Sequence, residues 1–270
     1  MVATDLARVS TGGQFRLYRA AAVAEQQAML LRGPGYWWLM LSGLVEPVFY
    51  LFAIGWGVGS LVGDVQVGGH SVPYLTYIAP ALLAASAMNG ALTEAGVNFF
   101  IKITGMKIYD PVLNTPVTPV DIAFGELAWS MVRGGIYGGA FLALISGMGL
   151  TEPWRAAAAL PATLLVCFAF GGLGLVVATL MRTFADYDYV AVVQAALFLF
   201  SGTFTPIGEY PGPVQVIVQL TPLWRGVDLL RSLTLGQFGW TVLLDVAYLL
   251  ALSAGGVVLS SRRLMRRFRV

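Results

Sequence analysis

Long apolar runs separated by short polar segments dominate the pattern along the chain. We expect six of these runs to be membrane-crossing helices, because about 20 apolar residues in a helix span the hydrocarbon core of a bilayer. The expected spans are residues 37–60, 74–97, 124–148, 156–181, 189–205 and 240–260. The runs are continuously apolar rather than alternating, which argues against the strands of a β-barrel. The pattern therefore predicts an all-α polytopic membrane protein with one transmembrane domain over residues 1–270.

An amphipathic segment precedes the first expected span. In residues 14–32, apolar positions such as Tyr18 and Ala22 can share one helical face, with Arg16, Arg19 and Glu25 largely off it. This arrangement is typical of a helix lying in the membrane interface. The helix should end at the Gly-Pro-Gly sequence of residues 33–35. We therefore divide the chain into an interfacial part (1–36), a six-span bundle (37–260) and a basic tail (261–270).

The segment between the second and third spans is rich in proline. Residues 98–129 contain three prolines and both lysines of the chain, Lys102 and Lys107. Residues 102–114 can form one or two short helical turns, which the prolines limit. A soluble partner protein could bind a short, rigid, exposed helix of this kind. A simple connector explains the spacing equally well.

The segment between the fifth and sixth spans, residues 201–239, is long but not hydrophilic. Residues 213–220 are apolar yet too short to span, and residues 222–235 are amphipathic, with Arg225, Asp228 and Arg231 near one face. Backbone at membrane depth must be helical or buried in protein. We therefore expect two short helices that enter the outer leaflet and return. A helical hairpin on the surface is the alternative.

The composition supports a membrane protein. Hydrophobic residues make up 57% and charged residues 11% of the 270, with a net charge of +2. Soluble domains carry about 25% charged residues, so a soluble enzyme is improbable, and the small net charge gives no sign of a nucleic-acid partner. A single cysteine, Cys167, excludes an intrachain disulfide and a multi-cysteine metal site.

The distribution of basic residues predicts the orientation. With both termini in the cytoplasm, twelve of the 16 lysines and arginines fall on the cytoplasmic side, three outside and one within a span. The twelve are Arg8, Arg16, Arg19, Arg32, Lys102, Lys107, Arg182, Arg262, Arg263, Arg266, Arg267 and Arg269. The opposite orientation would reverse this bias. We therefore expect both ends in the cytoplasm.

Four ionisable residues fall within or near the spans: Glu46, Glu94, Arg133 and Asp245. Each is costly in hydrocarbon, by at least about 2.5 kcal/mol at the centre, so each should face protein or water. Glu94 and Arg133 lie near the same ends of adjacent spans and could pair. These residues either form structural ion pairs or line a polar pathway, and both interpretations stand. The sequence indicates no partner for Asp245.

The chain shows no catalytic constellation. Neither lysine follows a glycine, so no phosphate-binding Gly-Lys motif exists, and the only histidine, His70, has no second histidine to pair with. We expect no catalytic residue, no metal and no cofactor bound by this chain. A passive membrane unit with a stiff cytoplasmic loop suggests movement driven by a separate subunit.

Five segments carry a resemblance to a known family. They are EPVFYLFAIGWGVG (46–59), TPVTPVDIAFGELAW (115–129), FADYDYVAVVQ (184–194), SGTFTPIGEYP (201–211) and TPLWRGVDLLRSLTLG (221–236). Together they resemble the membrane subunits of ABC type-2 exporters. The branch that holds the permeases of nodulation lipo-oligosaccharide exporters and daunorubicin-type drug exporters is the most similar.

The resemblance implies an assembly of two permeases, identical or related, with two ATP-binding subunits that hold ATP and Mg. It also implies roles for residues, which fall into four groups. A coupling helix would contact the ATP-binding subunit through Lys102, Lys107, Tyr109, Asp110 and Asn114, beside the interfacial helix with Arg16, Arg19 and Glu25. The pathway would involve Glu46, Asn89, Gln194, Phe198 and Phe204; Glu94 and Arg133 are added to this group as intramembrane charged residues, not through the resemblance. The outer gate would involve Pro206, Glu209, Arg225, Asp228 and Arg231.

The expected function is therefore that of the permease subunit of an ATP-driven exporter in the plasma (inner) membrane. The cargo would be amphipathic or lipidic, and a drug, a glycolipid and a lipo-oligosaccharide are all compatible with the sequence. A non-transporting scaffold or assembly subunit and an importer permease are the alternatives. A gene for an ATP-binding subunit beside this one would favour export over a scaffold.

Overall fold

A computed structural model describes residues 17–29, 36–67 and 69–267. Five long helices form the bundle: α3 (Tyr36–Gly57), α5 (Tyr74–Leu92), α7 (Pro119–Gly147), α8 (Pro153–Leu180) and α12 (Trp240–Arg267). The shorter α-helices are α2 (Leu17–Met29), α4 (Gly59–Val62), α6 (Tyr109–Val112), α9 (Tyr187–Phe200), α10 (Gly212–Gln219) and α11 (Pro222–Leu235). Helix α5 continues through two π-helical stretches, η2 (Thr93–Asn98) and η3 (Ile101–Gly105). Two 3-10 turns, η4 (Phe184–Asp186) and η5 (Ile207–Glu209), and the antiparallel strands β1 (Asp64–Val67) and β2 (His70–Pro73) complete the described part.

The architecture confirms the predicted all-α polytopic class, but not the number of spans. Within the described residues, five helices are long and apolar enough to cross a membrane, where we predicted six. The predicted span 189–205 corresponds to α9, which has only 14 residues. At 1.5 Å per residue it reaches about 21 Å. The helix stops because Gly202 adopts a left-handed conformation with φ of 64°, although the apolar sequence continues.

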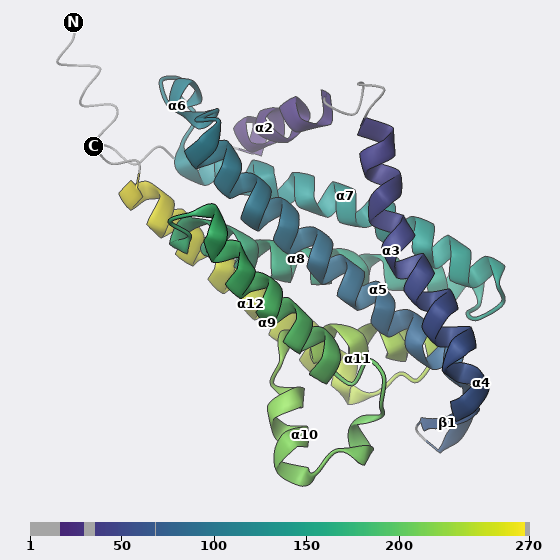
Figure 1. Cartoon of the computed structure of the whole chain (residues 1–270). Helices are drawn as coiled ribbons and strands as arrows, with labels where there is room; N and C mark the ends of the chain where they lie inside the picture. The colour runs from purple at the N-terminus through teal and green to yellow at the C-terminus, as the bar shows by residue number, and fades with distance from the viewer. Residues whose placement is uncertain (1–16, 30–35, 68, 268–270) are drawn as a thin grey trace, which may run out of the picture.

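The two ends of the bundle differ in character. Figure 1 shows α2, α6 and the C-terminal end of α12 at one end, which we call the loop end. Helix α4, the β-hairpin and α10 lie at the opposite end, which we call the hairpin end. Segments that the basic-residue count assigns to the cytoplasm, including α6 and the end of α12, are therefore gathered at the loop end.

Helix α8 is central to the packing, because α5, α7, α11 and α12 all contact it. Glycines allow two of these helices to approach α8 very closely. A Cβ atom on Gly256 of α12 would lie 2.7 Å from the carbonyl carbon of Gly172 in α8. A Cβ atom on Gly174 of α8 would lie 3.0 Å from the backbone nitrogen of Gly96. Small residues at helix crossings therefore permit backbone contact, as is common between membrane helices.

The amphipathic helix expected in residues 14–32 is present as α2, but its buried face differs from the predicted one. Ala20, Val23 and Gln27 are buried, while Tyr18 and Ala22 are exposed. Val23 fits against Gly125 of α7, where a Cβ atom would clash at 2.6 Å. Polarity alone misled the prediction, because the polar Gln27 is buried through a hydrogen bond to α7.

The two short helices expected between the fifth and sixth spans are present as α10 and α11. Leu223, Val227 and Leu230 of α11 are completely buried against the bundle, which α11 enters beside α5, α8 and α12. Helix α10 instead exposes Val216 and Ile217. The packing of α11 therefore fits an element inserted among spanning helices better than a hairpin lying on the surface.

Candidate functional site

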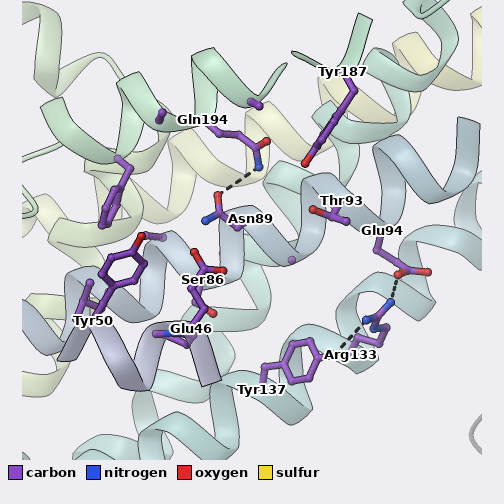
Figure 2. Close-up of a pocket in the computed structure, with 17 residues that line it drawn as sticks. Glu46, Tyr50, Ser86, Asn89, Thr93, Glu94, Arg133, Tyr137, Tyr187 and Gln194 are labelled. Carbon is purple, nitrogen blue, oxygen red and sulfur yellow. Dashed lines mark hydrogen bonds and ion pairs between the residues drawn. The ribbon is translucent and has the colours of Figure 1, made fainter. Parts of the chain in front are cut away.

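The largest grouping of predicted pathway residues lies in a groove between α3, α5, α7 and α9 (Figure 2). Its volume is about 490 Å³. Six of the seven predicted pathway residues line it: Glu46, Asn89, Glu94, Arg133, Gln194 and Phe198. These residues come from four separate helices, so the fold brings together side chains that the sequence keeps far apart.

Hydrogen bonds order the polar lining of the groove. Gln194 of α9 donates from Nε2 to Asn89 Oδ1 of α5 across 3.2 Å. At the other end of the groove Arg133 donates from Nη1 to Glu94 Oε2, which confirms that these two residues pair. Arg133 also donates from Nη2 to the Tyr137 hydroxyl at 3.1 Å. The arginine charge is therefore already engaged on the groove wall.

The π-helical stretch η2 positions Glu94. Residues 93–98 lie where α5 changes from α-helical to π-helical winding, and Glu94 and Thr93 of this stretch line the groove. A π turn widens the helix by one residue and often marks a functional position. Asn98 in the same stretch donates from Nδ2 to Glu94 Oε2 at 2.9 Å. The irregular winding thus fixes the carboxylate at the groove margin.

Glu94 also belongs to a buried charge network, which we define as Glu94, Lys102, Glu126 and Arg133. Lys102 Nζ lies 2.8 Å from Glu126 Oε2 and 3.7 Å from Glu94 Oε1. The Glu126 side chain is 0% exposed and that of Lys102 is 12% exposed. Two carboxylates and two cations therefore balance in a site where an unpaired charge would be costly.

The charge network reaches the loop end through two neutral partners. The Tyr109 hydroxyl of α6 donates to Glu126 Oε1, and Gln27 of α2 donates to the same oxygen at 2.9 Å. Lys102 donates to Gln27 Oε1 at 3.1 Å. Burial and the neighbouring Glu126 charge both raise the pKa of Tyr109, so its hydroxyl keeps the proton that it donates. One chain of contacts therefore connects α2 and α6 with the groove wall.

The predicted coupling residues separate into two groups. Lys107, Asp110 and Asn114 are exposed at the loop end, whereas Lys102 and Tyr109 point into the bundle and join the charge network. Tyr109 is buried and Lys102 is partly buried, and the polar atoms of both bind Glu126 of α7. Residues 102–114 therefore have an exposed edge, formed by Lys107, Asp110 and Asn114, and an inward side, formed by Lys102 and Tyr109.

Helix α2, which we predicted to be interfacial, contacts the same loop. Arg19 donates from Nη1 to the Pro116 carbonyl at 2.5 Å, and Glu25 is exposed on α2. Arg16 lies outside the described residues.

A second cavity, of about 680 Å³, lies at the hairpin end beside the C-terminal end of α3, and we call it the outer cavity. Phe204, which we had placed with the pathway residues, lines this outer cavity together with Pro206 and Glu209 of the predicted gate. Asp64 and Gln66 of the hairpin, Tyr74 of α5 and Thr205 supply the rest of its polar lining. The outer cavity therefore joins the hairpin to the 201–211 segment.

The remaining gate residues lie within the packing of α11. Arg225 lies 3.0 Å from Asp245 of α12, so the structure supplies the ion-pair partner that the sequence did not indicate. Arg231 donates to the Gly202 carbonyl at 3.1 Å and stacks 3.9 Å above the Tyr77 ring. Asp228 is partly buried on the same helix. These three residues do not line either cavity and instead anchor α11.

Several residues of the site were missing from the sequence-based prediction. Glu126 and Gln27 complete the charge network, and Tyr50, Tyr137 and Tyr187 form aromatic walls of the groove. Glu126 was detectable, because an acidic residue in an apolar run is the same signal that identified Glu94. The tyrosines carried no such signal, since aromatic residues in a span most often pack against lipid or core.

Comparisons with known proteins find relatives over most of the chain. Residues 23–235 match the family described as ABC-2 type transporter. Nodulation protein J of Rhizobium leguminosarum bv. viciae is 31% identical over 233 residues, 84% of this chain and 88% of that protein. Nodulation protein J of Sinorhizobium fredii (strain NBRC 101917 / NGR234) is 32% identical over 233 residues, 84% of this chain and 86% of that protein. Nodulation protein J of Rhizobium meliloti (strain 1021) is 29% identical over 199 residues, 73% of this chain and 74% of that protein.

Proposed function

The chain belongs to the ABC-2 type transporter family, and from this premise we propose that it is the permease of an ATP-driven exporter. The cargo is an amphipathic or lipidic molecule that leaves the cytoplasm or the inner leaflet. ATP and Mg are bound by separate subunits, and this chain supplies the path. The protein lies in the inner membrane with the loop end in the cytoplasm.

The observation that carries this proposal is the groove itself. It is bounded by four helices and combines amide and charged groups with aromatic rings, so one molecule can find polar and apolar contacts there. The groove is also open to one side, because α9 buries only Gln194 and exposes residues such as Val192 and Leu199. A lipid-like molecule can reach such a groove from the bilayer without passing through water.

Two kinds of partner follow from the exposed surfaces. Lys107, Asp110 and Asn114 form the exposed edge at the loop end, and an ATP-binding subunit contacts it. The exposed apolar faces of α3 and α9 flank the groove, with Phe49 and Trp56 on α3. A second permease, identical or related, covers these faces and closes the path.

The charge network can transmit movement of the ATP-binding subunits to the wall of the groove. When ATP draws the two ATP-binding subunits together, the exposed edge moves with them. Tyr109 then displaces Glu126 and Lys102, and Glu94 and Arg133 shift on the groove wall. Nucleotide biases the path only if these contacts differ between two states of the permease.

Reversing both charges of the exposed edge tests the coupling. We expect Lys107→Glu combined with Asp110→Lys to lower cargo-stimulated ATPase several-fold in the reconstituted complex, because the ATP-binding subunit would meet like charges. The measurement is ATP hydrolysis in proteoliposomes that contain this chain and an ATP-binding subunit that assembles with it. Arg182→Glu, an equally exposed charge reversal outside the edge, is the control and should leave stimulation unchanged.

Two results would contradict parts of the proposal. Equal stimulation in the double variant and the control would remove the coupling role of residues 107–110. ATPase that no amphipathic compound stimulates, in a complex that assembles normally, would favour a scaffold or assembly subunit. The direction of transport in inverted vesicles separates an exporter from an importer.

A further inference from the structure

Glu46 is the one charged residue of the groove that nothing in the described structure neutralises. It lies midway along α3, and its side chain is exposed to the groove. Glu94 and Arg133, the other two charged residues in the lining, pair with each other. Among the side chains that the structure describes, no ion pair or hydrogen bond to Glu46 is present. The groove therefore carries an excess of one negative charge.

The surrounding charge network does not compensate this excess. Its two carboxylates, Glu94 and Glu126, are matched by Lys102 and Arg133. Figure 2 shows Glu46, Tyr50 and Ser86 gathered at one end of the groove, and Glu94 and Arg133 at the other. A carboxylate in the middle of a membrane helix is costly unless water or a cation accompanies it. The groove that Glu46 lines is wide enough to admit such a partner.

Aromatic rings flank Glu46 and continue toward the hairpin end. The Tyr50 ring lies 5.9 Å from the Phe198 ring, and the Phe198 ring lies 5.1 Å from the Phe204 ring, measured between centroids. Tyr50 and Phe198 line the groove, while Phe204 lines the outer cavity. Faces of aromatic rings attract organic cations, particularly those that carry little hydration. The ring series therefore joins the two cavities by a surface suited to cations.

The outer cavity has the same sign of charge. Asp64 and Glu209 line it, and none of the described residues in its lining is basic. Asp64 accepts a hydrogen bond from the Ser71 hydroxyl at 2.9 Å and has no cationic partner among the ion pairs of the described residues. The excess of negative charge thus persists along the path from the groove to the hairpin end.

We propose that the groove binds amphipathic cations, with the Glu46 carboxylate as counter-ion and Tyr50 and Phe198 as aromatic walls. The ligand class is a lipophilic molecule with an ammonium or similarly diffuse positive head. This inference rests on the proposed export function and narrows its cargo. An anion would instead meet the uncompensated carboxylate and the acidic outer cavity, so it is excluded.

Two probes of matched shape and opposite charge test the charge preference directly. Tetraphenylphosphonium and tetraphenylborate would be measured by equilibrium dialysis against the purified full-length chain in phosphatidylcholine nanodiscs, with empty nanodiscs subtracted. We expect saturable binding of tetraphenylphosphonium and much weaker binding of tetraphenylborate. Tetraphenylborate bound at least as tightly by the unaltered chain would overturn the proposal without any variant.

Substitutions locate the binding. Glu46→Gln removes the charge and keeps the side-chain shape, so tetraphenylphosphonium should bind about tenfold more weakly. Glu46→Asp keeps the charge and should retain most of the affinity. Glu152→Gln removes an exposed carboxylate outside both cavities and should change nothing. Equal affinity of Glu46→Gln and the unaltered chain would overturn the assignment to this groove.

The outcome is separable from that of the export proposal, because neither probe measurement involves nucleotide. A groove without charge preference would overturn the cation inference, and cargo-stimulated ATPase would still test export. Conversely, saturable binding of the cation by a chain that supports no cargo-stimulated ATPase would support the cation site and contradict the export proposal.

Discussion

Replacing Lys102 with methionine is expected to lower the free energy of unfolding by about 3–5 kcal/mol, the effect of removing one partner from a buried ion pair. The substitution keeps an unbranched apolar side chain. It leaves two carboxylates, Glu94 and the 0% exposed Glu126, with Arg133 as the single remaining cation of the network. Gln27 and Tyr109 cannot supply the missing charge, because both are neutral. The measurement is equilibrium unfolding in mixed micelles with increasing denaturing detergent.

The chain contains its own control for this prediction. Lys107 is the only other lysine, and it is exposed at the loop end. Lys107→Met should change the free energy of unfolding by less than about 0.5 kcal/mol, as surface substitutions usually do. Adding Glu126→Gln to Lys102→Met should restore part of the loss, since the second change removes the uncompensated carboxylate. Equal stability of the two methionine variants would show that the network is not a buried ion cluster.

Two adjacent glycines of α12 should respond to alanine in opposite directions. Gly256→Ala places a Cβ atom within 2.7 Å of the α8 backbone at Gly172, so the helices must separate. Overpacking of this kind typically destabilises by about 1–3 kcal/mol. Gly255→Ala meets nothing within 4 Å and should stabilise the helix by up to about 1 kcal/mol, the difference in helix propensity.

The same unfolding assay measures both glycine variants. Because the two positions are neighbours in one helix, differences in insertion or expression affect them alike. A loss of stability at both positions would indicate that α12 is sensitive throughout, rather than at its crossing with α8. No loss at Gly256 would mean that α8 and α12 lie farther apart in the membrane.

The apolar runs predict the long helices well, because hydrocarbon length and backbone hydrogen bonding leave few alternatives. The Glu94–Arg133 pair also follows from sequence, since two opposite charges near the same end of adjacent spans have reason to meet. The apolar runs do not encode the rotation of each helix about its own axis. Asn89, Gln194 and Phe198 converge on the groove through tertiary packing, and a uniformly apolar helix gives no face by which to orient it.

Two differences between the sequence-based prediction and the structure have specific physical causes. The helix expected over 189–205 is present as α9 but ends before Gly202, whose backbone angle no hydropathy pattern reveals. The buried face of α2 was misplaced because Gln27 is polar and yet lies inside, where Glu126 accepts its hydrogen bond. In both cases a local backbone or side-chain interaction outweighed the average polarity of the segment.

The shortness of α9 has a consequence for the lipid around it. A helix of about 21 Å falls well short of a hydrocarbon layer of about 30 Å. The turn that follows it is shielded by protein, since Ser201 and Thr203 are 0% exposed and the Gly202 carbonyl accepts hydrogen bonds from Tyr77 and Arg231. We therefore expect the bilayer to become thinner wherever α9 faces lipid. Such thinning would shorten the distance that an acyl chain has to travel along this flank of the molecule.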